Sequence, residues 1–317
     1  MKKKRWKKSL IFKCICCLSG FLLIVVLLLQ SHTLFFEQKE KAAGGKIMTP
    51  ITRFEVAQEG IPEKEPVLTE PNLVAPSASI PTPDVAFKGS AAGAIRISGE
   101  RLFAWEIDKR WPAASLTKLL TAVVAFESLK KDDLILFTDD IIATEGESGG
   151  FIPGEVFTLN DSVGAMLVVS SNDAGEAIAS NYGRDRFITK MNQWAKEIGM
   201  ENSVFVDPTG LSIHNRTTIQ DIERLVQYIY QNHSDILAFT TKPQFTITSH
   251  LQKTTRTLYN INIFAGRDDF IGGKTGYIPS SGGNLVSIFR RLNDTVIITV
   301  FGTVDRFQET ENILHNL

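Results

Sequence analysis

Three short motifs, far apart along the chain, place the strongest constraint on its fold. They are Ser115-Leu-Thr-Lys118, Ser170-Ser-Asn172 and Lys274-Thr-Gly276, in that order. Together they supply a serine nucleophile, a lysine base, a second hydroxyl with an amide, and a strand that can hold a carboxylate. These groups can act together only if the fold brings all three segments to one place. The set therefore predicts an acyl-transfer enzyme whose site is assembled from distant parts of the chain.

The first motif opens a predicted helix over residues 116–129. Ser115 and Lys118 lie three positions apart and so share one face of that helix. A serine hydroxyl is a weak nucleophile and needs a base, a role that the Lys118 amine can take when it is neutral. The pattern alone is unspecific, because Ser128-Leu-Lys-Lys131 at the end of the same helix also fits it. A proline and two alanines precede Ser115 and leave access to a cleft, which favours Ser115 as the nucleophile.

The second motif lies between two predicted helices, over residues 163–169 and 174–181. Polar side chains between buried helices are costly unless they have partners. One interpretation is structural: the loop caps the second helix, with Asp173 as the capping residue. The functional interpretation makes Ser170 a proton shuttle to the leaving group and Asn172 a donor to the substrate amide.

The third motif lies in the glycine-rich strand segment Ile271-Gly-Gly-Lys-Thr-Gly-Tyr277. Glycines in a strand often mark a close approach by a ligand, although a glycine-rich bulge would give the same pattern. The Thr275 hydroxyl can bind a terminal carboxylate, Lys274 adds positive charge beside it, and Gly276 leaves room for substrate along the strand. Backbone N–H groups of Ser115 and Tyr277 are predicted to form an oxyanion hole.

The N-terminus predicts export to a membrane. Residues 1–13 carry seven Lys or Arg and no acid, and an apolar run follows from Cys14 to Leu29. No small-x-small cleavage site follows this run, so we expect residues 1–36 to be an uncleaved anchor with the basic end in the cytoplasm. A cleaved signal peptide is the alternative. Proline-rich residues 37–83 read as a flexible linker, and 84–317 as one extracytoplasmic domain.

Composition narrows the possible partners. With the basic cluster set aside, the rest of the chain is acidic, so nucleic acid is not expected as a partner. All three cysteines lie in the apolar run, and the histidines show no ligand spacing. We therefore expect no disulfide framework, no metal and no cofactor.

The periodicity of the domain alternates between strands and helices. Residues 92–98 and 101–107 predict a hairpin, and three strands are expected near 270–277, 284–289 and 295–301. Helices are predicted over 184–198, from Thr218 to about Tyr230, and over 309–317, in addition to those named above. This order predicts an α+β fold, with an antiparallel sheet built from N- and C-terminal strands and covered by helices.

Several segments together resemble a known family. Pro112-Ala-Ala-Ser-Leu-Thr-Lys-Leu-Leu-Thr-Ala122, Ser170-Ser-Asn-Asp-Ala174, Phe205-Val-Asp-Pro-Thr-Gly-Leu211 and Gly273-Lys-Thr-Gly276 look like the serine D-alanyl-D-alanine carboxypeptidases, the low-molecular-mass penicillin-binding proteins. The resemblance covers about residues 85–317 and includes connecting segments such as Phe151-Ile-Pro-Gly-Glu155. It implies the β-lactamase/transpeptidase-like fold with a helical subdomain.

The resemblance also implies roles and partners. Ser115 would be acylated with Lys118 as its base, Ser170 and Asn172 would form the second motif, and Lys274 with Thr275 would bind the substrate carboxylate. The substrate would be a peptidoglycan stem peptide ending in D-Ala-D-Ala, and β-lactams would be covalent inhibitors. Alternatives are a DD-endopeptidase that cuts cross-links and a non-catalytic wall-binding or β-lactam-sensing protein. A class A β-lactamase fits less well, because no Glu-x-x-Leu-Asn segment lies between the second and third motifs.

Overall fold

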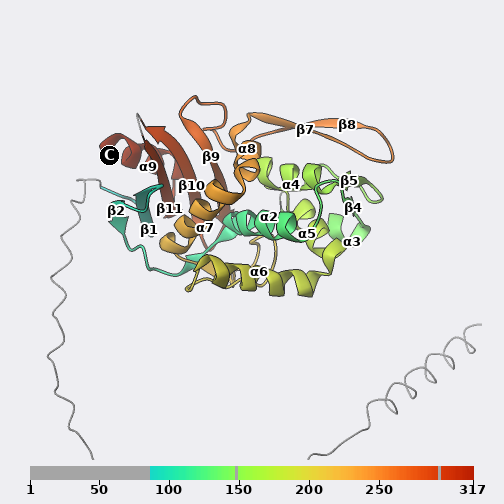
Figure 1. Cartoon of the computed structure of the whole chain (residues 1–317), viewed down its shortest axis with the longest axis horizontal. Helices are drawn as coiled ribbons and strands as arrows, with labels where there is room; N and C mark the ends of the chain where they lie inside the picture. The colour runs from blue at the N-terminus through green and yellow to red at the C-terminus, as the bar shows by residue number, and fades with distance from the viewer. Residues whose placement is uncertain (1–85, 147–148, 292–293) are drawn as a thin grey trace, which may run out of the picture. The chain divides into compact units, whose positions relative to one another are not determined.

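A five-stranded antiparallel sheet is the centre of the computed structural model, which describes residues 86–146, 149–291 and 294–317. Its strand order is β2-β1-β11-β10-β9, so the N-terminal hairpin pairs with the last strand of the chain (Figure 1). The five strands are β1 (Ala91–Arg96), β2 (Arg101–Trp105), β9 (Phe270–Ile278), β10 (Gly282–Arg291) and β11 (Asp294–Thr303). Strand β9, which carries the third motif, is therefore an edge strand.

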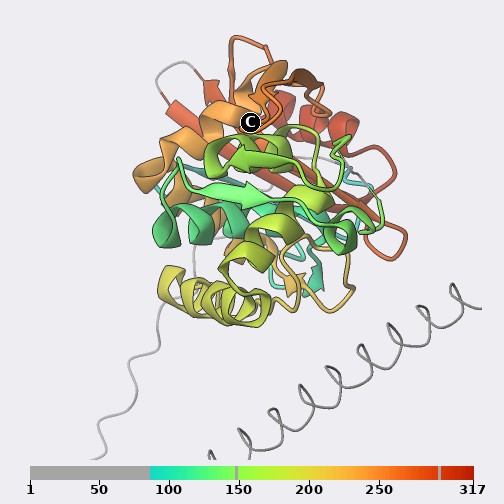
Figure 2. The same ribbon diagram turned by 90° about the vertical axis from the view of Figure 1, so that its right-hand side faces the viewer.

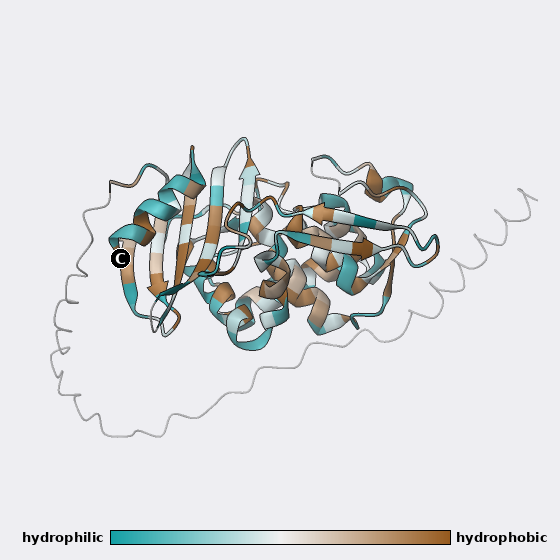
Figure 3. Ribbon diagram, turned by 90° about the horizontal axis from the view of Figure 1, so that it is seen from above, coloured by the Kyte–Doolittle hydropathy of each residue, from teal (hydrophilic) through white to brown (hydrophobic). Residues whose placement is uncertain are grey.

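Alternation of side chains along the strands gives the sheet two apolar faces. Val286 and Ile288 of β10 belong to the larger core, which lies toward the helices. Their neighbours Leu285 and Phe289 belong to a second core, which the C-terminal helix α9 (Arg306–Asn316) covers. Figure 3 shows apolar residues along the strands and more hydrophilic residues on α9. This period of two is what a sheet buried on both faces requires.

Helices fill the rest of the described structure. Helix α2 runs through the larger core beside the sheet, and α6 lies along the lower side of the helical part (Figure 2). In chain order, the helices of this part are the 3₁₀ helix η1 (Ala114–Leu116), α2 (Thr117–Ser128), α3 (Asp139–Ile142), α4 (Leu159–Val168), α5 (Asn172–Tyr182), α6 (Arg184–Ile198), α7 (Ile219–Asn232) and α8 (Ser234–Thr241).

Three small two-stranded ribbons complete the fold. Among them, the hairpin of β7 and β8 runs along α4 and leads directly into the segment before β9 (Figure 1). Arg256 of β8 forms an ion pair with Glu155 and donates to the Gly150 carbonyl, which fastens the hairpin to the 150–155 segment. The ribbons are β3 (Trp111–Pro112) with β6 (Arg216–Thr217), β4 (Leu134–Leu136) with β5 (Val156–Thr158), and β7 (Gln244–Thr248) with β8 (Thr255–Tyr259).

The predicted fold class is confirmed: helices cover an antiparallel sheet made from both ends of the domain. The predicted helix over 184–198 has those bounds, and Thr158 and Thr218 cap α4 and α7 by accepting from the N–H groups of Asp161 and Asp221. The sequence patterns did not predict α3, α8 or any of the three ribbons. The predicted anchor (1–36) and linker (37–83) lie outside the described residues. No helix within the described residues is long and apolar enough to cross a bilayer.

Candidate active site

The first motif is built at the junction of η1 and α2. Lys118, in the first turn of α2, is fully buried, and its Nζ lies 2.9 Å from the Oγ of Ser115. The same Nζ donates to the Oδ1 of Asn172 and to the backbone carbonyl of Thr209, both at 2.8 Å. Carbonyl oxygens can only accept, so these two contacts orient two N–H bonds. A neutral Lys118 amine would then direct its lone pair at the Ser115 hydroxyl, which is the arrangement that a general base needs.

The second motif lies between α4 and α5. Ser170 is a buried residue with φ +59°, a left-handed conformation that a serine rarely adopts. A serine keeps this strained backbone conformation only where the surrounding structure enforces it, and such residues cluster at functional sites. Asn172 joins two segments: its Oδ1 accepts from Lys118, and its Nδ2 donates to the Glu145 carbonyl at 2.7 Å. In this structure, Asn172 therefore holds the base in place.

The third motif brings a second buried lysine to the second serine. Lys274 Nζ lies 2.9 Å from Ser170 Oγ and donates to the Thr275 carbonyl at 2.9 Å. Each serine of the site thus has its own lysine, Ser115 with Lys118 and Ser170 with Lys274. The three predicted motifs converge, as the sequence requires.

Strand β9 comes up against the backbone that carries the nucleophile. A Cβ added at Gly276 would lie 3.2 Å from the backbone nitrogen of Ser115, so this position has almost no room for a side chain. The register places Tyr277 next along the strand, with its side chain 63% exposed. This approach favours an oxyanion hole formed by the N–H groups of Ser115 and Tyr277, which stays a prediction.

Two residues outside the three motifs hold this junction together. Asn284 of β10 donates from Nδ2 to the carbonyls of Pro112 and Ala113 at 2.9 and 3.3 Å, and its Oδ1 accepts from the Gly302 N–H. Arg306 donates to the Gly276 carbonyl at 3.1 Å, and burial lowers its pKa below the usual guanidinium value. The sequence patterns predicted neither the role of Asn284 nor that of Arg306.

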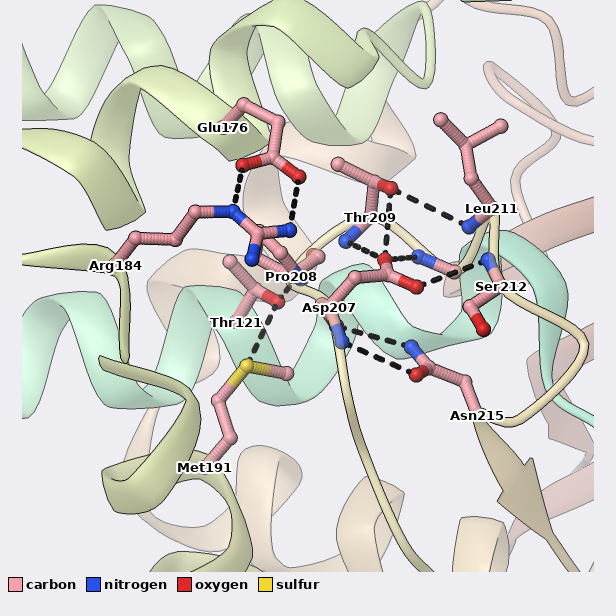
Figure 4. Close-up of polar contacts among 11 residues, drawn as sticks. Thr121, Glu176, Arg184, Met191, Asp207, Pro208, Thr209, Leu211, Ser212 and Asn215 are labelled. Atoms are coloured by element: carbon pink, nitrogen blue, oxygen red, sulfur yellow. Dashed lines mark hydrogen bonds and ion pairs between the residues drawn. The ribbon is translucent and has the colours of Figure 1, made fainter. Parts of the chain in front are cut away.

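A tightly bonded loop over residues 207–215 carries the Thr209 carbonyl that accepts from Lys118. Figure 4 shows the hydrogen bonds that hold this loop. Asp207 Oδ1 accepts from the N–H groups of Thr209 and Gly210 at 2.7 and 2.6 Å, and its Oδ2 accepts from the Ser212 N–H at 2.9 Å. Asn215, fully buried, donates to the Asp207 carbonyl at 3.0 Å. The Asp-Pro-Thr-Gly segment signalled this loop, but its contact with the base was not foreseen.

Gly210 in this loop touches the first motif directly. Its φ is +88°, and an added Cβ would lie 1.8 Å from the Ala114 carbonyl oxygen. Thr121 of α2 fastens the same loop by donating to the Pro208 carbonyl at 2.6 Å. The loop and the start of α2 therefore act as one unit that fixes Ser115 and Lys118.

One expectation about the second motif is wrong. Asp173 does not cap α5; the side chain of Ser171 does so by accepting from the Ala174 N–H at 3.1 Å. Asp173 is fully buried, and neither carboxyl oxygen has a hydrogen-bond partner among the described residues. Burial raises the pKa of Asp173 from its usual value of 3.8 to about 6.

The second S-x-x-K match plays no part in this site. Lys131 forms an ion pair with Asp235 and does not reach Ser128. Within the part of the chain that the structure describes, no group of three or more His, Cys, Asp or Glu side chains is placed to hold a metal ion.

Comparisons with known proteins identify the family. The family model described as D-alanyl-D-alanine carboxypeptidase, peptidase family S11, matches residues 89–305. A D-alanyl-D-alanine endopeptidase of Pseudomonas aeruginosa is 28% identical over 75% of this chain and 79% of its own length. The D-alanyl-D-alanine carboxypeptidase DacF of Bacillus subtilis is 28% identical over 70% of this chain and 59% of its own length. The chain belongs to the D-alanyl-D-alanine carboxypeptidase family.

Solved structures show the same fold. A D-alanyl-D-alanine carboxypeptidase of Mycobacterium tuberculosis gives a TM-score of 0.69 at 24% identity, covering 77% of this chain and 94% of that one. Penicillin-binding protein D2 of Listeria monocytogenes, in its ampicillin-bound form, gives 0.66 at 26% identity, covering 74% and 99%. The β-lactamase/transpeptidase-like fold expected from the resemblance is confirmed.

Proposed function

We propose that this protein is a serine DD-carboxypeptidase that removes the terminal D-alanine from peptidoglycan stem peptides. The observation that carries the proposal is the Lys118 amine, buried and held 2.9 Å from Ser115 Oγ by two carbonyl oxygens. This arrangement activates a hydroxyl for attack on a carbonyl. Family membership and the hydrolases among the relatives support the same reaction class.

The first half of the reaction forms an ester on Ser115. Lys118 takes the hydroxyl proton as Ser115 Oγ attacks the carbonyl between the last two D-alanines. The carbonyl oxygen becomes an oxyanion, which backbone N–H groups of Ser115 and Tyr277 would stabilise. When the C–N bond breaks, the leaving amine takes a proton from the Ser170 hydroxyl, which Lys274 contacts at 2.9 Å. The proton that Lys118 took from Ser115 then replaces the one that Ser170 gave up, so Lys118 is neutral again for the second half of the reaction. D-Alanine leaves, and Thr275 releases its carboxylate.

The second half consumes water. Lys118 takes a proton from a water molecule that attacks the ester, and Ser115 Oγ recovers its proton as the acyl group leaves as a carboxylate. A β-lactam carries a strained amide in the same position, so Ser115 would open its ring and remain acylated. The relative solved with ampicillin bound supports this expectation.

A second reaction has support from a specific observation. Several relatives are named D-alanyl-D-alanine endopeptidases, including one from Haemophilus influenzae that is 35% identical over 57% of this chain and 63% of its own length. Both reactions use the same acyl-enzyme and differ only in the leaving amine. The cellular location is also a proposal: the basic cluster and apolar run of residues 1–36 would anchor the protein in the membrane with the catalytic domain outside. Recovery of the full-length chain in the soluble fraction would contradict it.

Labelling with a fluorescent penicillin tests the nucleophile. Ser115→Ala should abolish covalent labelling and D-alanine release from a pentapeptide, since it removes the hydroxyl that lies 2.9 Å from the Lys118 amine. Ser128→Ala is the matched control, because Ser128 begins the other S-x-x-K match and should leave labelling unchanged. Persistent labelling of Ser115→Ala would remove the assignment. Labelling of the wild type without any peptide hydrolysis would instead favour a sensing role.

A further inference from the structure

A basic pocket of about 370 Å³ lies at the end of the loop over residues 207–215. Its lining residues are Arg110, Ile213, His214 and Arg216, and none of them is an acid. Ile213 and His214 belong to the loop itself, and Arg216 begins β6, which pairs with β3 directly after Arg110. None of these residues lies in the three motifs, so the sequence patterns did not predict this pocket.

The two arginines of the pocket lie close together without a counter-charge. Arg216 Nη2 donates to the backbone carbonyl of Arg110 at 3.0 Å. Several other arginines in the described structure form ion pairs with acids, but Arg110 and Arg216 form none there. The acids nearest to them along the chain, Asp108 and Asp221, each bond to another side chain. Neighbouring like charges destabilise a fold, so an anion that enters the pocket gains attraction from both guanidinium groups.

The pocket is joined to the nucleophile by a short stretch of bonded backbone. Arg110 precedes Ser115 by five residues, which span at most about 18 Å when extended. Asn215, which two pocket residues flank, accepts from the Ala113 N–H through its carbonyl at 2.8 Å. A substrate acylated on Ser115 therefore lies only a few residues of peptide away from the pocket.

Apolar side chains of the same loop lie between the catalytic cleft and the pocket. Leu211 Cδ2 would lie 3.8 Å from a Cβ added at Gly146, and Asn172 Nδ2 would lie 2.6 Å from that Cβ. Leu211, which is 38% exposed, therefore borders the Asn172 side of the cleft. Two residues further along, Ile213 is 49% exposed and lines the pocket. An aliphatic part of a ligand can follow this surface from the cleft to the guanidinium groups.

The proposed reaction indicates which part of a peptide reaches the pocket. The leaving D-alanine lies toward Ser170 and Thr275, so the residues before the scissile bond extend in another direction. An extended peptide advances about 3.3–3.6 Å per residue, so the two residues that precede D-Ala-D-Ala, with their side chains, reach roughly 10–15 Å from the scissile carbonyl. Guanidinium groups bind carboxylates through paired N–H donors, and the His214 ring can add another donor.

We infer that this pocket binds a carboxylate on one of the two residues that precede D-Ala-D-Ala in the substrate. The inference rests on the proposed function and gives a substrate preference that the three motifs leave open. The enzyme then selects a peptide with an acidic side chain over the same peptide with an amide in its place. This contact lies before the scissile bond, so it is independent of which amine leaves.

Two acetylated pentapeptides test the inference. Both end in D-Ala-D-Ala, and they differ only in having Glu or Gln at the two preceding positions. Wild type should hydrolyse the Glu peptide with a kcat/KM about tenfold higher, because hydrogen bonds between charged groups are stronger than neutral ones. Arg110→Gln should remove most of this preference by slowing hydrolysis of the Glu peptide alone. Hydrolysis of the Gln peptide and acylation by fluorescent penicillin should stay within about twofold of wild type.

Further variants separate charge from structure. Arg216→Gln should act like Arg110→Gln, and Arg216→Lys, which keeps the charge, should retain part of the preference. Because Arg216 also bonds to a backbone carbonyl, thermal unfolding and penicillin acylation check its variants for damage to the loop. Arg290→Gln is the matched control, since Arg290 is an exposed arginine near the end of β10 and should leave the preference unchanged. Higher salt should weaken the preference of wild type.

The outcomes separate the inference from the proposed function. Equal kcat/KM for the two peptides, or a preference that survives when Arg110 and Arg216 are both changed to Gln, would overturn the pocket assignment while the carboxypeptidase proposal stands. Binding of a glycerol phosphate polymer that these changes abolish, without any preference between the peptides, would also overturn it and assign the pocket to a phosphate polymer. A wild type that hydrolyses neither peptide would overturn the proposed function together with this inference.

Discussion

The two walls of the active site are built in different ways. The helical wall holds Lys118 by contacts with Ser115, Asn172 and Thr209, and the bonded loop of Asp207 and Asn215 fixes the Thr209 carbonyl that faces this amine. The strand wall is an edge strand with glycines and an exposed Tyr277. A preorganised wall suits bond making, because its groups need no rearrangement during the reaction. An open wall suits substrate choice, since it can accept leaving groups of different size.

Removing each buried lysine should give the largest contrast between the walls. Lys118→Met deprives Ser115 of its base, so penicillin acylation should fall by about 10³ to 10⁴-fold. Lys274→Met keeps that base and removes positive charge beside the carboxylate, so acylation should fall by about 10²-fold. Single-turnover acylation rates measure both, with thermal unfolding as the check on folding. Equal losses in the two variants would show that both walls contribute alike to the chemistry.

A methyl group placed on each wall gives a second contrast. Gly210→Ala puts a Cβ against the Ala114 carbonyl at φ +88°, so the free energy of unfolding should fall by about 3 kcal/mol or more. Gly276→Ala meets its nearest atoms at 3.2 Å and should cost about 1 kcal/mol. The same change should slow acylation, because the strand moves away from Ser115.

Urea unfolding together with acylation rates distinguishes these two effects. Gly183→Ala is a suitable control, since its φ is also positive and an added Cβ meets nothing within 4 Å. A stability loss for Gly210→Ala no greater than that of this control would contradict the tight contact with Ala114.

The smallest expected effect concerns Asp173, beneath the helical wall. Its pKa of about 6 lies above the unfolded value of 3.8, so the folded protein binds this proton more tightly than the unfolded chain does. The resulting stability is fully present below about pH 4 and is lost as the pH rises through 6. Asp173→Asn should therefore match wild type at pH 4 and be more stable at pH 7.5 by on the order of 1 kcal/mol. Parallel urea titrations at the two pH values measure this difference, and a variant that is less stable at pH 7.5 would contradict it.

The parts of the site that sequence predicted are those with local signals. Ser115 and Lys118 share a helix face because of their spacing alone, and the glycines around Lys274 mark a strand that something approaches. Convergence of the three motifs could be expected from the chemistry that they share. The acid at position 173 was misread because aspartate and serine are both good capping residues, and only the structure shows which one turns inward.

The parts that sequence missed depend on contacts between distant segments. Asn284 bonds to carbonyls at Pro112 and Ala113, a pairing that no local pattern announces. The contact of the Thr209 carbonyl with Lys118 uses a backbone atom, which every residue has. Helix α8 carries a weak periodic pattern, and the β7–β8 strands alternate mainly threonine with single buried residues, so neither gave a clear signal.

The pairing of β1 with β11 has a consequence for the order of events during synthesis. Strand β1 has its partner only after β11 has been made, and such long-range pairing is slow to form. The nucleophile emerges early, but Asn284, Lys274 and the strands that carry them arrive last. A nascent chain should therefore remain inert until β11 has been made and can pair with β1, which delays hydrolytic activity well past the synthesis of the nucleophile.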